Sequence, residues 1–333
     1  MSNIGRAFEH KPPSAGGAGA CYRPATLADA LELLAGFADE SPARQLRPIL
    51  LAGGTDIYPA HVGRAPAGPV IDLGRLRELN EIAVVTEAGQ RWLRIGALTR
   101  WACLRDRRHP ALGGAAFDAL AMAAAEIGGR QIQSRATLAG NLCNASPAAD
   151  GVPALLALQA SVRLRRASGT RLLPLTQFIV GPRRTALAAD ELLEAVYLPL
   201  EAFDDTHSVF LKLGHRRFLV ISAVMVAVSL TWRGDTQRQL SVCRIGVGAC
   251  GPVATRLGAL EDRLLGLDAR QLQAFASQPL SPTWLADLQP IDDLRGTAGF
   301  RLQAAQICVQ RALLALAGAP AQSVAHLSLE PPQ

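Results

Sequence analysis

The chain has 333 residues, of which 49% are hydrophobic, 19% are charged and only 5% are aromatic, and its formal net charge is +6. The low aromatic content, without any long basic run, argues against a nucleic-acid partner. The six cysteines include no C-x-x-C pair, so we expect no zinc site, no iron–sulfur cluster and no other metal in this chain.

Neither the amino terminus nor any apolar run predicts targeting to a membrane. Residues 1–20 lack the apolar core of a secretion signal, and their Pro, Gly and Ala content predicts a mobile lead-in. The longest apolar run, 218–232, falls short of the roughly 20 residues of a membrane span. Isolated cysteines favour a reducing compartment, so we predict a cytoplasmic protein without a membrane span.

The first predicted element is an amphipathic helix over 26–38, with Thr26 as its N-cap and Asp29 in its first turn. Residues 104–125 predict helical structure that is interrupted at Pro110 and at Gly113-Gly114. The other elements are short apolar runs bounded by turn residues. Strands are predicted at 48–52, 70–73, 92–97, 161–166, 171–174, 191–198, 209–213, 222–232 and 240–248, and further helices at 152–160, 256–265 and 300–317.

The mixed order of these strands and helices predicts an α+β protein with separate lobes rather than a regular β-α-β alternation.

One glycine motif resembles a dinucleotide-binding fingerprint but lacks its context. Residues 246–251 match G-x-G-x-x-G after a strand-like run, but Pro252 follows directly and no second strand ending in an acid appears. A dinucleotide fingerprint needs both a helix and that strand. We therefore interpret this motif as a strand end and a turn.

Two segments rich in small residues are candidates for binding a phosphate group. Residues 131–150, QIQSRATLAGNLCNASPAAD, predict a loop that combines close backbone approach with polar side chains. Residues 48–57, PILLAGGTDI, predict a strand that ends in a nest of amides. Each segment alone is also compatible with an ordinary turn. Together they predict two halves of a chain that grip one large diphosphate ligand.

At this point the chain resembles the FAD-binding subunit or domain of the molybdenum hydroxylases. This family includes xanthine dehydrogenases, aldehyde oxidoreductases and aerobic carbon monoxide dehydrogenases. The resemblance covers about residues 20 to 320, and the long motif 127–150 is its most specific part. The matching motifs, in the family's order, are AGGTD (52–56), IGALTRWACL (95–104), IGGRQIQSRATLAGNLCNASPAAD (127–150), FLKLGHRR (210–217) and IGVGACGPVATRLGALE (245–261).

The resemblance implies a two-lobed flavin-binding α/β domain of the PCMH type, followed by a C-terminal α+β domain with a small antiparallel sheet and helices. We place the FAD-binding domain at 21–205, with lobes at about 21–75 and 76–205. The C-terminal domain is expected at 206–320 and a tail at 321–333.

The resemblance also implies that FAD lies extended between the two lobes. The backbone of 52–56 would cradle the pyrophosphate, completed by residues 137–141, and Asp150 would bind ribityl or ribose hydroxyls. Leu193 would pack on the isoalloxazine, and Lys212 would favour the reduced, anionic ring. No residue is expected to be catalytic. The expected FAD contacts are Leu51, Ala52, Gly53, Gly54, Thr55, Asp56, Ile127, Thr137, Ala139, Gly140, Asn141, Asp150, Leu193 and Lys212.

Lys212 is one of only two lysines in the chain, the other being Lys11. An alternative interpretation of Lys212 is a surface lysine at a strand end.

The implied function is electron transfer within a larger enzyme. A large subunit with a molybdenum cofactor would hydroxylate the substrate, and a small subunit with two 2Fe–2S clusters would pass electrons to FAD in this chain. The complex would be a heterotrimer or a dimer of heterotrimers. Residues 216–221, RRFLVI, lack the acid that several NAD-using relatives carry there. The terminal acceptor therefore stays open among NAD, a quinone, a cytochrome and oxygen.

Two alternative functions remain. A stand-alone flavin-dependent oxidoreductase of the same fold would need a proton donor over the ring, and the six histidines form no obvious constellation for this. An assembly scaffold without cofactor would not need the glycines of both segments or Asp150. Flavin content separates these two alternatives from each other.

Overall fold

The structure is a computed structural model, and its mixture of helices with mainly antiparallel sheets agrees with the predicted α+β class. The predicted lead-in, apart from Ala20, and the predicted tail lie outside the described residues. No helix of the described part is long and apolar enough to cross a membrane. The described residues are 20–39, 47–200, 203–216, 219–234 and 238–318.

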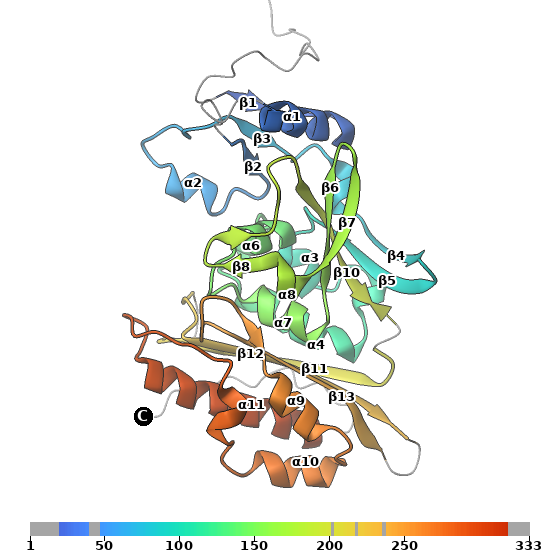
Figure 1. Cartoon of the computed structure of the whole chain (residues 1–333), viewed down its shortest axis with the longest axis vertical. Coiled ribbons are helices and arrows are strands. Elements are labelled where there is room, and N and C mark those ends of the chain that lie inside the picture. The colour runs from blue at the N-terminus through green and yellow to red at the C-terminus, as the bar shows by residue number, and fades with distance from the viewer. Residues whose placement is uncertain (1–19, 40–46, 201–202, 217–218, 235–237, 319–333) are drawn as a thin grey trace, which may run out of the picture.

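The amino-terminal part is a small parallel sheet of order β1-β3-β2 together with the helices α1 and α2 (Figure 1). Helix α1 begins as predicted. Oγ1 of Thr26 accepts a hydrogen bond from the amide of Asp29 (3.2 Å), and the Asp29 carboxylate accepts one from the amide of Thr26 (3.0 Å). Its elements are β1 (Cys21–Tyr22), α1 (Leu27–Asp39), β2 (Ile49–Leu51), α2 (Ile57–Ala60) and β3 (Val70–Asp72).

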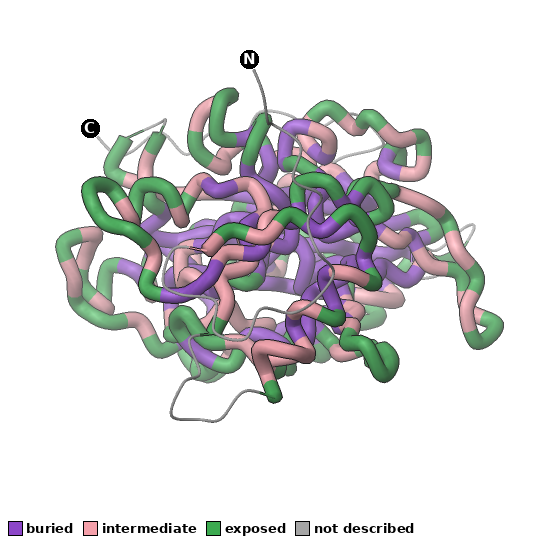
Figure 2. The backbone as a smooth tube through the Cα atoms, turned by 90° about the horizontal axis from the view of Figure 1, so that it is seen from above, coloured by how far each residue is buried: buried purple, intermediate pink, exposed green. Residues whose placement is uncertain are grey.

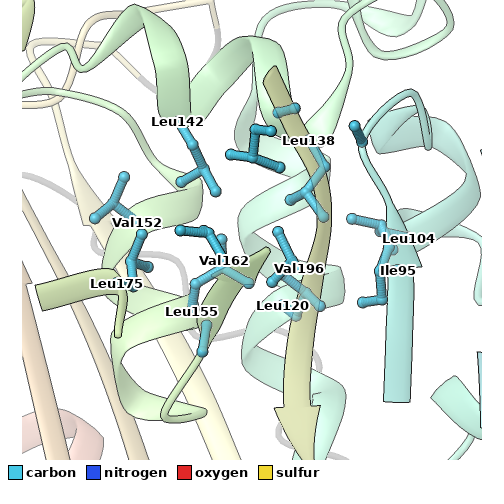
Figure 3. Packing of buried hydrophobic residues seen from close by; sticks show 14 of the residues in the cluster. Ile95, Leu104, Leu120, Leu138, Leu142, Val152, Leu155, Val162, Leu175 and Val196 are labelled. Atoms are coloured by element: carbon cyan, nitrogen blue, oxygen red, sulfur yellow. The ribbon is translucent and has the colours of Figure 1, made fainter. Parts of the chain in front are cut away.

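A five-stranded antiparallel sheet of order β4-β5-β10-β6-β7 forms the centre of the molecule. Its middle strand, β10, is buried along its whole length. Apolar side chains from α6, α7, β6 and β10 converge beside it (Figure 3). The elements are β4 (Ile82–Glu87), β5 (Gln90–Gly96), α3 (Trp101–Arg105), α4 (Asp118–Glu126), α5 (Arg130–Gln133), α6 (Leu138–Asn144), α7 (Gly151–Ala157), β6 (Ser161–Arg166), β7 (Gly169–Pro174), α8 (Leu175–Phe178), β8 (Ile179–Gly181), β9 (Arg184–Thr185) and β10 (Leu192–Pro199).

The C-terminal part is a four-stranded antiparallel sheet between two layers of helices (Figure 1). Alternation along β12 explains this position: Val226 and Val228 pack with the C-terminal helices, whereas Met225 and Ala227 belong to the core of the preceding part. Strand β12 is therefore buried on both faces along nearly its whole length. Figure 2 shows how buried residues gather in the middle of the molecule, with exposed residues toward its outside. The elements are β11 (Thr206–Leu213), β12 (Val224–Arg233), β13 (Gln239–Gly248), β14 (Thr255–Arg256), α9 (Gly258–Leu264), α10 (Ala269–Ala276) and α11 (Ala298–Gly318).

The main departure from the expected elements lies in residues 131–150, which we predicted to be loop-rich. Much of this segment is helical, as the end of α5 and the whole of α6. Thr137 is the N-cap of α6, and Ala145 ends the helix in the left-handed region with φ 45°. The small residues therefore allow close helix packing as well as turns. Strand β4 and helix α10 were not predicted either.

The glycine motif at 246–251 has a packing role, which agrees with its interpretation as a strand end. A Cβ on Gly246 would lie 2.6 Å from the carbonyl oxygen of Pro153, and one on Gly248 would lie 2.9 Å from Cγ of Pro153. Pro153 belongs to α7. The two glycines thus let α7 approach β13 closely, and this contact joins the C-terminal part of the chain to the part that precedes it.

Gly246→Ala should lower the free energy of unfolding by about 1–3 kcal/mol, since the new methyl group must push α7 away from β13. Gly258→Ala is the matched control, because Gly258 is helical and has no atom within 4 Å of an added Cβ. That control should change stability by less than about 1 kcal/mol. Urea unfolding measures both variants, and equal stability of the two would contradict the packing role.

Candidate functional site

Two adjoining cavities lie between β2 and α6. The larger cavity, of about 530 Å³, extends to Arg183 and Leu193, and the smaller cavity, of about 280 Å³, extends to Trp101 and Ile127. Four residues line both cavities, so the two adjoin, and together they are called the groove below. The shared residues are Leu50, Ala52, Gly140 and Cys143.

Eleven of the fourteen predicted FAD contacts line this groove. Leu51, Asp150 and Lys212 do not line either cavity. The contacts in the smaller cavity are Ala52, Gly53, Gly54, Thr55, Asp56, Ile127, Thr137, Gly140 and Asn141, and those in the larger cavity are Ala52, Ala139, Gly140 and Leu193.

The alternation of side chains along β2 separates Leu51 from the groove. Successive residues of a strand point to opposite faces. Leu50 and Ala52 line the groove, whereas Leu51 is a buried core residue (9% exposed). The predicted contact of Leu51 with FAD stays a prediction, and Leu50 is the neighbouring residue that lines both cavities.

The first segment offers backbone donors to the smaller cavity. The amides of Gly53, Gly54 and Thr55 make no hydrogen bond to another described residue. The protein itself requires both glycines here. A Cβ on Gly53 would lie 3.0 Å from Cα of Ala136, and Gly54 has φ +76° and would place a Cβ 2.7 Å from the ring of Tyr58. The free amides, rather than the missing side chains, are what this segment presents to a ligand.

The second segment differs from the prediction, because its amides are already used. The amide of Ala139 donates to the carbonyl of Ala97 (3.0 Å), that of Gly140 donates to Oγ1 of Thr137 (3.1 Å), and that of Asn141 donates to the carbonyl of Thr137 (3.1 Å). Residues 137–141 therefore do not complete a cradle of free amides. They contribute side chains and the close approach that Gly140 allows.

A polar bridge joins the two segments across the groove. Nδ2 of Asn144 donates to Oδ1 of Asp56 (3.0 Å), and Oδ1 of Asn144 accepts from Arg183. The Asp56 side chain thus holds the second segment as well as lining the smaller cavity. The bridge connects the two segments in the wall of the smaller cavity, at the point where the first segment ends.

Asp150 and Lys212 form a buried ion pair, and the predicted contact of each with FAD stays a prediction. Nζ of Lys212 lies 2.8 Å from Oδ2 of Asp150 and also donates to the carbonyl of Glu126 (3.1 Å). Ser222 donates to the other oxygen of Asp150 (2.5 Å). The Lys212 side chain is 7% exposed, so its interpretation as a surface lysine is wrong.

Leu193 and Lys212 were both predicted to lie at the flavin ring, but the structure places them near different cavities. Leu193 lines only the larger cavity. Lys212 is bonded to the carbonyl of Glu126, next to Ile127, which lines only the smaller cavity. One extended ligand can touch both regions only with different parts of its length.

Sequence reasoning missed several groove residues. Arg47, Arg183 and Arg184 border the larger cavity, where their charges suit an anionic ligand. The pair in G-P-R-R (181–184) was a visible signal, but the basic residues of this chain are widespread. Trp101, in the wall of the smaller cavity, gave no signal of its own. Among the described residues no group of three or more His, Cys, Asp or Glu side chains is arranged to hold a metal ion.

Two family profiles match the chain. Residues 14–201 match the FAD binding domain in molybdopterin dehydrogenase, and residues 210–316 match the CO dehydrogenase flavoprotein C-terminal domain. The xanthine dehydrogenase FAD-binding subunit of Escherichia coli O157:H7 is 29% identical over 297 residues, which cover 88% of this chain and 94% of that protein. The nicotinate dehydrogenase FAD-subunit of Eubacterium barkeri is 36% identical over 209 residues, covering 61% and 65%.

Solved structures agree with these matches. Carbon monoxide dehydrogenase from Hydrogenophaga pseudoflava contains a chain with a TM-score of 0.73 and 26% identity, covering 91% of this chain and 97% of that one. Quinoline 2-oxidoreductase from Pseudomonas putida 86 gives 0.74 and 25%, covering 90% and 97%. The chain therefore belongs to the family of FAD-binding domains in molybdopterin dehydrogenases. The expected family, fold, oxidoreductase class and FAD cofactor are confirmed.

Lys212→Met should destabilise the protein by about 3–5 kcal/mol, because it leaves the Asp150 carboxylate buried without its cation. Lys212→Met combined with Asp150→Leu is the matched control, and it should regain most of this loss because no buried charge remains. Chemical unfolding of the three proteins measures the effect. A double variant that is no more stable than the single one would show that the ion pair is not the cause.

The loss in Lys212→Met should also depend on pH. Burial raises the pKa of Asp150, while Lys212 and Ser222 lower it. An acid whose pKa is raised in the folded state destabilises that state above the unfolded pKa of about 4, increasingly as pH rises. Removing Lys212 raises the pKa further. The loss of stability should therefore be larger at pH 8 than at pH 5, and a loss that is independent of pH would contradict this.

Proposed function

We propose that this chain, as a member of that family, is the FAD-binding medium subunit of a heteromeric molybdenum-containing hydroxylase or dehydrogenase. Bound FAD would take up electrons delivered from 2Fe–2S clusters of a small subunit and release them to a terminal acceptor. The molybdenum cofactor would belong to a large subunit. The observation that carries the proposal is the pair of adjoining cavities with free amides at Gly53, Gly54 and Thr55.

The residues of the groove fit FAD in charge and in shape. An extended dinucleotide needs a long cavity with donors for its pyrophosphate and apolar walls for its ring systems. The amides of 53–55 supply donors in the smaller cavity, and the three arginines supply positive charge beside the larger cavity. Apolar walls occur at both ends, with Ile127 and Ile132 at one end and Leu187 and Leu193 at the other.

We assign the ring of FAD to the end of the groove at Ile127. This end lies next to the Lys212–Asp150 pair, through the bond from Lys212 to the carbonyl of Glu126. A cation held there would stabilise negative charge nearby. The Lys212 charge would thus act on the flavin ring at close range although the Lys212 side chain does not line the cavity. Leu193 would then contact the other end of the cofactor.

The same end of the molecule carries exposed apolar side chains that suit a protein partner. Leu219 and Ile221 are 63% and 64% exposed, and a Cβ on Gly129 would lie 3.4 Å from Leu219. Exposed large apolar residues beside a cofactor site are typical of interaction surfaces. We propose that this segment faces the small 2Fe–2S subunit, within a heterotrimer or a dimer of heterotrimers in the cytoplasm. Residues 217 and 218 of the RRFLVI stretch lie outside the described part, and the acceptor stays open.

The first experiment is to purify the chain together with whatever subunits bind it, and then to record its visible spectrum and identify the released chromophore by mass. Bound FAD with molybdenum and iron in the complex supports the proposal. FAD bound to a chain that reduces its own substrate without partners would favour a stand-alone oxidoreductase. A chain that takes up no added FAD would overturn the proposal.

Gly54→Ala should weaken FAD binding at least about tenfold, because φ +76° disfavours a side chain and the methyl group meets Tyr58, which displaces the amides of the first segment. Gly63→Ala is the matched control. Gly63 has a similar φ of +73°, but nothing lies within 4 Å of an added Cβ and it lines neither cavity. Titration of the apoprotein with FAD measures both variants. Equal weakening by the two would mean that the first segment does not hold the cofactor.

A further inference from the structure

One buried glutamine side chain closes the carboxyl end of helix α4. Gln133, the last residue of α5, is 3% exposed. Its Nε2 donates to the carbonyl of Ala125 (2.8 Å) and to the carbonyl of Gly128 (3.4 Å). The last four carbonyls of a helix have no partner within that helix. Gln133 supplies a donor to one of them, and the same side chain ties the turn at 127–129 to α5.

The orientation of the Gln133 amide is determined by its third partner. Nη1 of Arg105 donates to Oε1 of Gln133, and an arginine side chain can only donate. The oxygen of the amide therefore faces Arg105, and its nitrogen faces the two carbonyls. Arg105 is itself held by Asp106, which accepts from its Nε (2.6 Å) and from its Nη2 (3.0 Å). The Gln133 side chain is thus fixed through both ends of its amide group.

The turn that Gln133 holds carries the apolar wall at one end of the groove. Ile127 and Ile132 both line the smaller cavity, and the turn connects them. The turn packs tightly against Ile132, since a Cβ on Gly128, whose φ is +55°, would lie 2.9 Å from Cβ of Ile132. A loss of the hydrogen bonds from Gln133 would therefore loosen both apolar residues of this wall.

We propose that Gln133 is a positioning residue for the flavin ring: it holds the turn at 127–129 so that Ile127 faces the ring. This inference rests on the proposed FAD site and on the assignment of the ring to that end of the groove. Gln133 lines neither cavity, so it acts through the turn. A wall that is ordered before the ligand arrives binds it more tightly, because ordering the wall during binding would oppose association.

The test measures the affinity of the apoprotein for FAD and the visible circular dichroism of the bound FAD. Gln133→Met removes all three hydrogen bonds with little change in volume, and it should weaken FAD binding about tenfold. The circular dichroism of the bound flavin should change as well, because it reports on the surroundings of the ring. Gln133→Glu still accepts from Arg105 but cannot donate to the two carbonyls, so it should behave like Gln133→Met. It carries the test if Gln133→Met does not fold.

Gln310→Met is the matched control. Nε2 of Gln310 donates to the carbonyls of Ala276 (3.1 Å) and Gln278 (2.6 Å), so this side chain closes the end of helix α10 as Gln133 closes α4. Gln310 lies in the C-terminal part and lines neither cavity. Its substitution should lower the urea midpoint of unfolding, as that of Gln133 should, but it should leave the FAD affinity and the circular dichroism of bound FAD unchanged.

Two outcomes would overturn the inference and leave the FAD site standing. In the first, both Gln133 variants bind FAD with native affinity and a native spectrum, so the turn does not need this side chain. In the second, Gln310→Met weakens FAD as much as Gln133→Met does, so a general loss of stability is the cause. A native chain that takes up no FAD would instead reject the proposed function together with this inference.

Discussion

The buried contact between Asp150 and Lys212 connects the two parts of the chain at the point where the groove ends. Asp150 precedes α7 at the close of the second segment, and Lys212 lies on β11 of the C-terminal sheet. The two charges are nearly excluded from water, so each depends on the other. Because Lys212 also binds the carbonyl of Glu126, movement of the C-terminal sheet would move the backbone next to Ile127. The shape of the smaller cavity is thus coupled to the docking of the two parts.

The sequence predicted most long elements because their apolar periodicity is local. Strand β6, helix α1 and helix α11 follow from the apolar patterns of their own residues, which do not depend on which element packs beside them. Helix α6 was missed because its residues are small and polar, and small residues favour both turns and close helix packing. The choice between these was made by Thr137, whose hydroxyl caps the helix by accepting from Gly140. That hydrogen bond is local, but the residue types of the segment suit a turn equally well and so do not predict it.

The prediction of the site was limited because hydrogen-bond partners cannot be read from sequence motifs. Motif resemblance placed eleven of fourteen residues in the groove, but it could not say which atoms stay free. The amide of Ala139 was expected to bind phosphate, yet it donates to the carbonyl of Ala97, and the amide of Asn141 is used within helix α6. Asp150 was expected to bind a sugar hydroxyl, and the structure adds an ion pair with Lys212 to that expectation. The pairings with Ala97 and with Lys212 are long-range, and residue types and spacing do not encode them.

A cofactor site can be recognised by polar atoms that the protein leaves unused. The carboxylate of Glu261 accepts hydrogen bonds from Ile245 and from Arg256. The amides of residues 53–55, by contrast, line the smaller cavity without a hydrogen-bond partner among the described residues. Amides that line a cavity and have no partner within the protein are available as donors to a ligand with phosphate groups, and the pyrophosphate of FAD is such a ligand.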